Sequence, residues 1–135
     1  MRRDFFLEEN MKDYLKLFNN YIKTFDYKDK MILHKFHHTY RVMDFCEQIA
    51  LSINEDIKIA QLCGLFHDIG RFEQYKKYQT YSDIHSIDHG NLGALILKEN
   101  FNSIENYDLI LFTTKNHNKL TIEKTGDHEK LLFTK

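Results

Sequence analysis

Residues 59–70 read Ile-Ala-Gln-Leu-Cys-Gly-Leu-Phe-His-Asp-Ile-Gly, and this stretch decides the class of fold. Gln61 is the only polar side chain in its first eight positions. A helix that is apolar around nearly its whole circumference lies buried at the centre of a protein. We therefore predict a central helix over 55–68, with the pair His67-Asp68 at its end.

Both ends of this central helix carry recognisable signals. Asn54 is followed by two acidic residues, which is typical of a helix N-cap, and Gly70 is placed as a C-terminal stop. Apolar residues at helical spacing predict further helices on either side. Their ranges are 8–25, 37–53, 71–77, 87–100 and 105–116, and Asp127 begins one more. Residues 78–85 are predicted to form a loop.

Apolar stripes indicate which faces of these helices enter the core. The stripe of the first helix consists of Met11, Leu15, Phe18, Ile22 and Phe25. The stripe of the second helix consists of Val42, Phe45, Cys46, Ile49, Ala50 and Ile53. In the helix over 87–100, for which Ser86 is the predicted cap, Gly90 and Gly93 would let a neighbouring helix approach closely.

Length and composition fit one compact all-α domain over 1–135, a bundle of five or six helices. A net charge of −1 gives no positive field that would attract nucleic acid. No apolar run is long enough to span a membrane, and the N-terminus turns acidic too soon for a signal peptide. Cys46 and Cys63 lie in apolar helical stretches without CxxC spacing, so we expect buried free thiols and a reducing cytoplasm.

Eight histidines stand out in a chain of this length, and their positions matter more than their number. Four of them fall on inward-facing positions near the ends of four predicted helices: His38, His67, His89 and His117. Asp68 joins them, and a buried carboxylate is costly unless it is paired or bound to a metal. Imidazoles and a carboxylate form a ligand set suited to Fe, Mn, Co, Ni or Zn, and helical bundles build such sites from several helices.

Each of these histidines also has a simpler interpretation. A single inward His is more often a hydrogen-bonded core residue than a metal ligand, and a His-Asp dipeptide also occurs by chance. Spacing alone therefore leaves both interpretations open. The remaining four histidines are predicted to be bystanders: His34, His37, His85 and His128. His85 lies in the polar loop, where it is either solvated, as we favour, or a substrate contact.

Four motifs in this order resemble the HD-domain superfamily of metal-dependent phosphohydrolases, and in particular its small stand-alone bacterial members. They are His38-Thr39-Tyr40-Arg41-Val42, Leu65-Phe66-His67-Asp68-Ile69-Gly70-Arg71-Phe72-Glu73-Gln74, Ser86-Ile87-Asp88-His89-Gly90 and Asn116-His117-Asn118. The resemblance covers roughly residues 30–135, with the core motifs in 30–118. The His-Asp pair alone is not specific, whereas the ordered set on successive helices is fairly specific.

The resemblance implies a ligand set for one or two divalent ions of Mn, Fe, Co, Ni, Zn or Mg. His38 would be the first ligand, and His67 and Asp68 would be the pair. His89 and His117 match two further histidines that hold a second metal in some members of the superfamily. Asp68 would then bridge the two ions.

The sequence departs from the pattern of the superfamily at its end. There the closing Asp lies on a late helix, in a stretch that would follow Leu131-Leu132-Phe133, and this sequence ends at Lys135. We therefore expect a domain that lacks its last helix: a fragment, a naturally short form, or a chain with an incomplete metal site. The apolar groove left by the missing helix could drive self-association into a homo-oligomer.

The implied function is hydrolysis of a small phosphate ester, such as a nucleotide or a related monoester or diester, by a metal-activated water. Asp68 would orient that water, and Arg71 is the predicted phosphate contact, with a surface salt bridge as its simpler interpretation. Glu73 and Gln74 are candidates for orienting a ligand histidine. Two alternatives remain open. One is a diiron oxygenase of the HD type, and the other is a metal- or nucleotide-binding module that the missing Asp leaves without catalysis.

Overall fold

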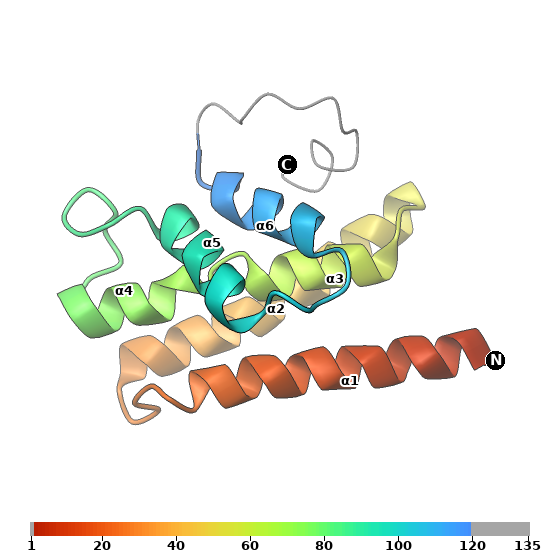
Figure 1. Cartoon of the computed structure of the whole chain (residues 1–135), viewed down its shortest axis with the longest axis horizontal. Helices are drawn as coiled ribbons and strands as arrows, with labels where there is room; N and C mark the ends of the chain where they lie inside the picture. Colours follow the sequence, from red (N-terminus) through yellow and green to blue (C-terminus); the bar gives the residue numbers. More distant parts are fainter. Residues whose placement is uncertain (1, 120–135) are drawn as a thin grey trace.

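The computed structural model describes residues 2–119, with side chains from Met11 onward. This part of the chain consists of six helices joined by short connections (Figure 1). They are α1 (Arg2–Ile22), α2 (Lys30–Ile53), α3 (Ile57–Phe66), α4 (Gly70–Tyr78), α5 (His89–Asn100) and α6 (Tyr107–Asn116). No strand occurs in the described residues, so the predicted all-α class is confirmed. None of these helices is both long and apolar enough to cross a bilayer.

Helix α3 forms the centre of the bundle, as its composition predicts. It packs against α2 and against α6, and seven of its residues are buried: Ile59, Ala60, Leu62, Cys63, Gly64, Leu65 and Phe66. Its N-cap is Asp56, whose carboxylate accepts a hydrogen bond from the backbone N–H of Ile59 at 3.0 Å. The prediction of Asn54 as that cap is wrong. Asn54 instead ends α2 in the left-handed conformation, which Asn tolerates better than most residues.

Helix α2 begins earlier than predicted and buries a different face. Asp29 caps its start by accepting a hydrogen bond from the N–H of Met31, so residues 30–36, which precede the predicted helix, are helical as well. The side chains of Phe45, Ile49 and Ile53 are 61%, 58% and 52% exposed, which contradicts half of the predicted stripe. The buried residues are Ile32, Thr39, Met43 and Ala50. Both sets have helical spacing, so periodicity alone could not select the face that meets α3.

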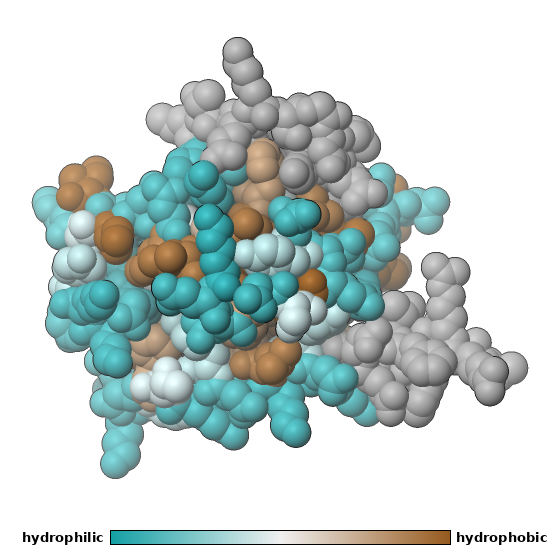
Figure 2. Space-filling view, viewed as in Figure 1, coloured by the Kyte–Doolittle hydropathy of each residue, from teal (hydrophilic) through white to brown (hydrophobic). Residues whose placement is uncertain are grey.

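Aromatic rings join α1 to the rest of the bundle. The side chain of Phe18 is fully buried, and its ring centroid lies 6.3 Å from those of Tyr40, Phe66 and Phe72, one on each of α2, α3 and α4. Phe25 is buried at the end of the same stripe, which confirms the inward face predicted for α1. In the same view, Figure 2 shows a surface that is mainly hydrophilic with separate apolar patches.

Two glycines bring α4, α5 and α6 close together. A Cβ on Gly70 would lie 2.3 Å from the carbonyl oxygen of His89, and a Cβ on Gly90 would lie 2.7 Å from that of Lys115. The close approach predicted for Gly90 is therefore confirmed. The prediction of Gly70 as the end of the central helix is wrong: it begins α4, and no described glycine has a positive φ. Asp88, rather than Ser86, caps α5.

The expectations for the end of the sequence lie outside the described residues. These are the helix from Asp127, the absence of a closing Asp ligand, and the groove left by a missing last helix. Self-association through such a groove stays a prediction.

Candidate metal centre

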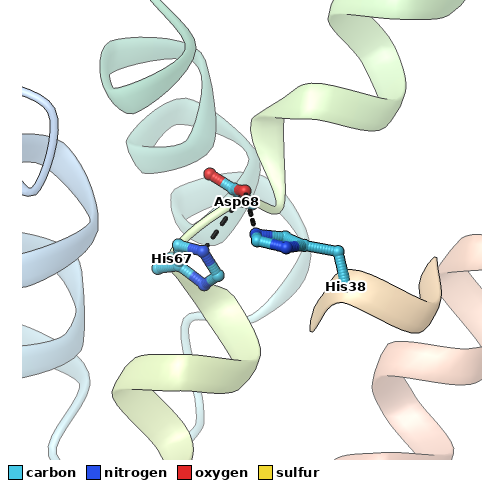
Figure 3. A group of neighbouring side chains, drawn as sticks. All are labelled: His38, His67 and Asp68. Carbon is cyan, nitrogen blue, oxygen red and sulfur yellow. Dashed lines mark ion pairs between the residues drawn. The ribbon is translucent and has the colours of Figure 1, made fainter. Parts of the chain in front are cut away.

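The candidate metal centre is built around Asp68, in the short connection between α3 and α4 (Figure 3). Helix α3 ends at Phe66 and α4 begins at Gly70. The two residues beside Asp68, His67 and Ile69, keep right-handed helical backbone angles. The chain therefore turns within three residues, and Asp68 is buried with only 5% of its surface exposed. A carboxylate in this position needs positively charged or hydrogen-bonding partners.

Two histidines approach the same oxygen of Asp68 from different elements. His67 Nε2 lies 3.2 Å from Asp68 Oδ2, and His38 Nε2, reaching in from α2, lies 3.4 Å from it (Figure 3). The side chain of His38 is 34% exposed, so it lies at the edge of the core rather than inside it. The ligand atoms of the three residues all lie within 4.8 Å of one another, which is close enough to share one metal ion.

The other oxygen of Asp68 faces two further histidines. His89, the first residue of α5, and His117, the C-cap of α6, each place Nε2 3.3 Å from Asp68 Oδ1. The two Nε2 atoms lie 2.9 Å apart. Asp68 thus belongs to two groups that could each hold an ion, and each group consists of two histidines and this one carboxylate. The structure brings together all four histidines that the sequence analysis selected.

Hydrogen bonds at Nδ1 decide what three of these imidazoles offer to the centre. His67 Nδ1 lies 2.6 Å from the carbonyl oxygen of Gly64, and His117 Nδ1 lies 2.7 Å from that of Thr114. His89 Nδ1 lies 2.7 Å from a carboxylate oxygen of Asp83. These oxygens accept hydrogen bonds, so we assign the proton to Nδ1 in each ring. In the neutral imidazole, Nε2 then carries a lone pair and faces Asp68.

This arrangement fits a divalent cation. With their Nδ1 protons engaged, the neutral rings of His67, His89 and His117 direct lone pairs at an ionised carboxylate, and two of the lone pairs face each other. Only added positive charge, from protons or from a metal ion, makes such a cluster favourable. Imidazole nitrogens with a carboxylate oxygen are ligands suited to Mn, Fe, Co, Ni or Zn. Hydrogen bonds from the far nitrogen of a ligating imidazole hold its ring in the binding orientation.

The charges around the centre keep its ligands in the forms that bind metal. Burial by itself would raise the pKa of Asp68, but protons on the Nε2 atoms of His117, His67 and His89 that face it, where no metal ion takes their place, outweigh burial and hold this pKa well below its ordinary value. Burial lowers the pKa of His38, and the nearby charge of Lys35 lowers it further. Asp68 is therefore ionised and His38 is neutral at pH 7, as metal coordination requires.

Arg71 lies beside Asp68 and is tied to the loop that follows α4. Its Nη1 donates hydrogen bonds to the carbonyl oxygen of Tyr81, to Asp83 Oδ1 at 3.0 Å and to Gln74 Oε1 at 3.0 Å. Its Nε lies 3.9 Å from Asp68 Oδ1 and is buried without a hydrogen-bond partner. Arg71 thus forms an ion pair with Asp83, and its role as a phosphate contact stays a prediction.

The residues around the ligands form a second, continuous network. Gln74 is fully buried, and its Nε2 donates to Asp83 Oδ1, Ser86 Oγ and the carbonyl oxygen of Ile87. Burial opposes ionisation of Asp83, but its hydrogen bonds from Gln74 and His89 prevail and lower its pKa. Gln74 therefore holds the loop, the loop holds Asp83, and Asp83 orients His89.

Sequence reasoning missed Lys35 and Asp83. Lys35 Nζ lies 3.3 Å from Asp68 Oδ2, but the predicted helix began after it. Its position three residues before His38, on the same helix face, is the signal that could have found it. Asp83 lies in an irregular loop, where no periodicity relates it to His89. Only the folded chain reveals that contact.

The remaining histidines lie outside both ligand groups where the structure describes them. His34, His37 and His85 are exposed and take no part in either ligand group. His128 lies outside the described residues. A sixth ligand in the place of the closing Asp of the superfamily is not found among residues 11–119.

Comparison with known proteins gives one match. The family model described as the HD domain matches residues 36–132, which is more than half of the chain. The match contains His38, the His67-Asp68 pair, His89 and His117. No curated protein and no solved structure matches the chain.

Proposed function

Because the chain belongs to the HD-domain family, we propose that it is a metal-dependent hydrolase of small phosphate esters, with nucleotides as the first substrates to test. The observation that carries this proposal is the pair of ligand groups that share Asp68. One carboxylate between two pairs of imidazoles is suited to holding two cations side by side. Paired cations of this kind stabilise both the attacking and the leaving oxygen of a displacement at phosphorus.

A divalent ion held here would supply the nucleophile by lowering the pKa of a coordinated water from 15.7 to about 7. The chain's own residues orient the reacting groups. Asp68 accepts a hydrogen bond from the attacking water and keeps it aligned. The backbone carbonyls of Gly64 and Thr114 fix the rings of His67 and His117, so their Nε2 atoms stay directed at the site. Arg71 places a guanidinium beside Asp68, where it can attract the phosphate of the substrate.

The same proposal includes the cellular compartment, which we expect to be the reducing cytoplasm. Both cysteines are free, and burial raises the pKa of the Cys63 thiol to about 12. An unreactive buried thiol and a second, half-buried free thiol at Cys46 support a reducing cytoplasm.

The experiment measures metal content first and then phosphate release. Purified protein is analysed for metals and assayed with nucleoside monophosphates, triphosphates and cyclic diesters, before and after chelation. We expect metal-dependent turnover that falls by at least about 100-fold in Asp68→Asn, because the substitution removes a ligand from both groups and the group that orients the water. Asp44→Asn, at an exposed position of α2, is the matched control and should leave turnover unchanged. Full activity in Asp68→Asn would contradict the proposal.

A second candidate function is oxidation by molecular oxygen at iron. Each ligand group consists of two histidines and one carboxylate, a set that non-haem iron oxygenases also use. Anaerobically reconstituted Fe²⁺ protein, exposed to oxygen together with the same compounds, distinguishes the two functions. Oxygen consumption coupled to loss of the compound supports the oxygenase, whereas phosphate release without oxygen consumption supports the hydrolase.

A further inference from the structure

Lys35 contacts the metal centre but cannot be one of its metal ligands. It lies on α2, one turn before His38, and its Nζ is 3.3 Å from Asp68 Oδ2. The side chain is 14% exposed, and Nζ also lies 5.2 Å from the ring centroid of Tyr81. An ammonium group donates hydrogen bonds and has no lone pair to give to a metal ion. Lys35 therefore acts as a positively charged hydrogen-bond donor to Asp68.

The oxygen that Lys35 contacts is the one that His38 and His67 share. These two histidines place Nε2 3.4 Å and 3.2 Å from Asp68 Oδ2. A cation bound by His38, His67 and Asp68 would lie against this same oxygen. Two like charges so close together repel each other, and they compete for one set of lone pairs. The ammonium and the metal are therefore alternative partners of Asp68 Oδ2.

Arg71, the other cation beside Asp68, is held differently. Its Nη1 has three acceptors, and its ion pair with Asp83 anchors it to the loop. Among the described residues, Asp68 is the one hydrogen-bond partner that the structure gives Lys35 Nζ. A lysine also has a flexible stem of four carbons, whereas the guanidinium of Arg71 is fixed in a network. Lys35 is thus the cation that can leave Asp68 without breaking any other hydrogen bond that the structure gives it.

We propose that Lys35 is a displaceable counter-ion: it neutralises Asp68 in the metal-free protein and, once metal binds, turns its ammonium to a phosphate of the substrate. In its contact with Asp68, the ammonium already lies beside the metal centre and against the face of Tyr81. It would therefore need to move only a short way to reach a bound phosphate. The inference rests on the proposed function and adds a substrate-binding residue to it. It predicts opposite effects of Lys35 on metal binding and on phosphate binding.

The first measurement is calorimetric titration of Co²⁺ into chelator-stripped protein. Lys35→Met keeps the length of the side chain and removes the charge. We expect it to bind Co²⁺ more tightly, by roughly 5–150-fold, which is the usual size of a coupling between two binding events in one protein. Lys35→Arg keeps the charge and should remain close to wild type. Lys30→Met, which removes an exposed lysine from the same helix, controls for net charge.

The second measurement is titration of inorganic phosphate into the Co²⁺-loaded proteins. Lys35→Met should bind phosphate roughly tenfold or more weakly, because one charge-assisted hydrogen bond is lost. Lys35→Arg should retain most of the phosphate binding, and Lys30→Met should match wild type. The opposite signs of the two effects separate this exchange from a purely structural ion pair.

The outcomes are distinguishable. Unchanged Co²⁺ affinity in a folded Lys35→Met protein overturns the inference, and so does unchanged phosphate affinity. If the substitution lowers the unfolding temperature equally with and without Co²⁺, Lys35 is only a structural partner of Asp68. Tight Co²⁺ binding with the expected Lys35 effects, but without hydrolysis of any ester, would contradict the proposed function and leave the exchange supported. A wild-type chain that binds no metal would contradict both.

Discussion

His89 and His117 lie on the side of Asp68 where α4, α5 and α6 meet, whereas His38 reaches Asp68 from α2 at the edge of the molecule. On the first side, His89 Nδ1 is hydrogen-bonded to Asp83. At Gly70 and Gly90, the backbone of α5 lies directly against the backbones of α4 and of the end of α6. On the second side, the described residues offer His38 Nδ1 no hydrogen-bond partner. The group of His89 and His117 is therefore held in place before metal arrives. In the other group the carbonyl oxygen of Gly64 fixes His67, and His38 alone has room to adjust.

This difference has a consequence for metal affinity. A ligand set that is already oriented loses little conformational freedom on binding, so its intrinsic affinity is high. On the His38 side, a partly exposed ring and a neighbouring ammonium both weaken binding. We therefore expect the group Asp68-His89-His117 to fill first. The group His38-His67-Asp68 should fill at higher metal concentration.

The largest expected effect comes from disturbing the backbone contact between Gly70 and His89, on the side of the centre that is held in place. In Gly70→Ala, the new Cβ would lie 2.3 Å from the carbonyl oxygen of His89 and 2.7 Å from the backbone nitrogen of Gly93. Neither atom can move without shifting α5, so we expect a loss of about 3 kcal/mol in the free energy of unfolding. Urea denaturation measures it. Gly93→Ala is the matched comparison and should cost less, because the nearest atom there is a side-chain methyl of Thr114 at 3.0 Å. Equal losses would contradict the explanation.

A smaller effect is expected when the orientation of His89 is released without changing a ligand. Asp83→Asn keeps the shape of the side chain and removes the charge that holds the proton on His89 Nδ1. Partners of this kind typically contribute about 10–100-fold to metal affinity. We expect a loss in that range for the tighter Co²⁺ site and little change for the weaker one. Titration calorimetry resolves the two. A uniform loss at both sites would show that the two sides do not differ as described.

The smallest effect concerns the cap of the helix that begins with His89. Burial opposes ionisation of Asp88, but its bond from Lys119 and the backbone N–H of Asn91 hold its pKa well below the ordinary value. A pKa lowered in the folded state stabilises the fold above the unfolded-state pKa, near 4, and this stability is lost as pH falls toward the folded-state pKa. Asn is as good a cap as Asp, so Asp88→Asn removes only the negative charge at the helix N-terminus and should cost about 0.3–1 kcal/mol at pH 7.

Denaturation at two pH values checks this sign. The difference in unfolding free energy between wild type and Asp88→Asn should shrink below about pH 4, because the unfolded wild-type chain then takes up a proton at Asp88 while the folded protein does not yet do so. Asp44→Asn, at an exposed position without a capping bond, should show no such difference at either pH. A gap that widens in acid would contradict the assignment of Asp88 as an ionised cap.

Sequence reasoning succeeded where a local pattern reflects a strong physical preference. The nearly all-apolar segment from Ile59 to Phe66 could only be buried, and the stripe through Phe18 and Ile22 had one interpretation. It failed on α2, because this long helix has apolar residues at helical spacing on two faces, and periodicity does not say which face is buried. It also failed at Asn54 and Gly70, because each residue type suits either end of a helix.

The sequence by itself determined the helical class, the buried α3 with the His67-Asp68 pair after it, and the four histidines that face inward near helix ends. These follow from hydrophobic periodicity, which depends on residues a few positions apart. Only the tertiary structure decided that Asp68 shares its two oxygens between two histidine pairs, that Asp83 orients His89, and that Lys35 lies against the same carboxylate. Such contacts join residues from separate helices and an irregular loop. The packing of α2 and α6 against α3, and of α5 against α4 and α6, sets them.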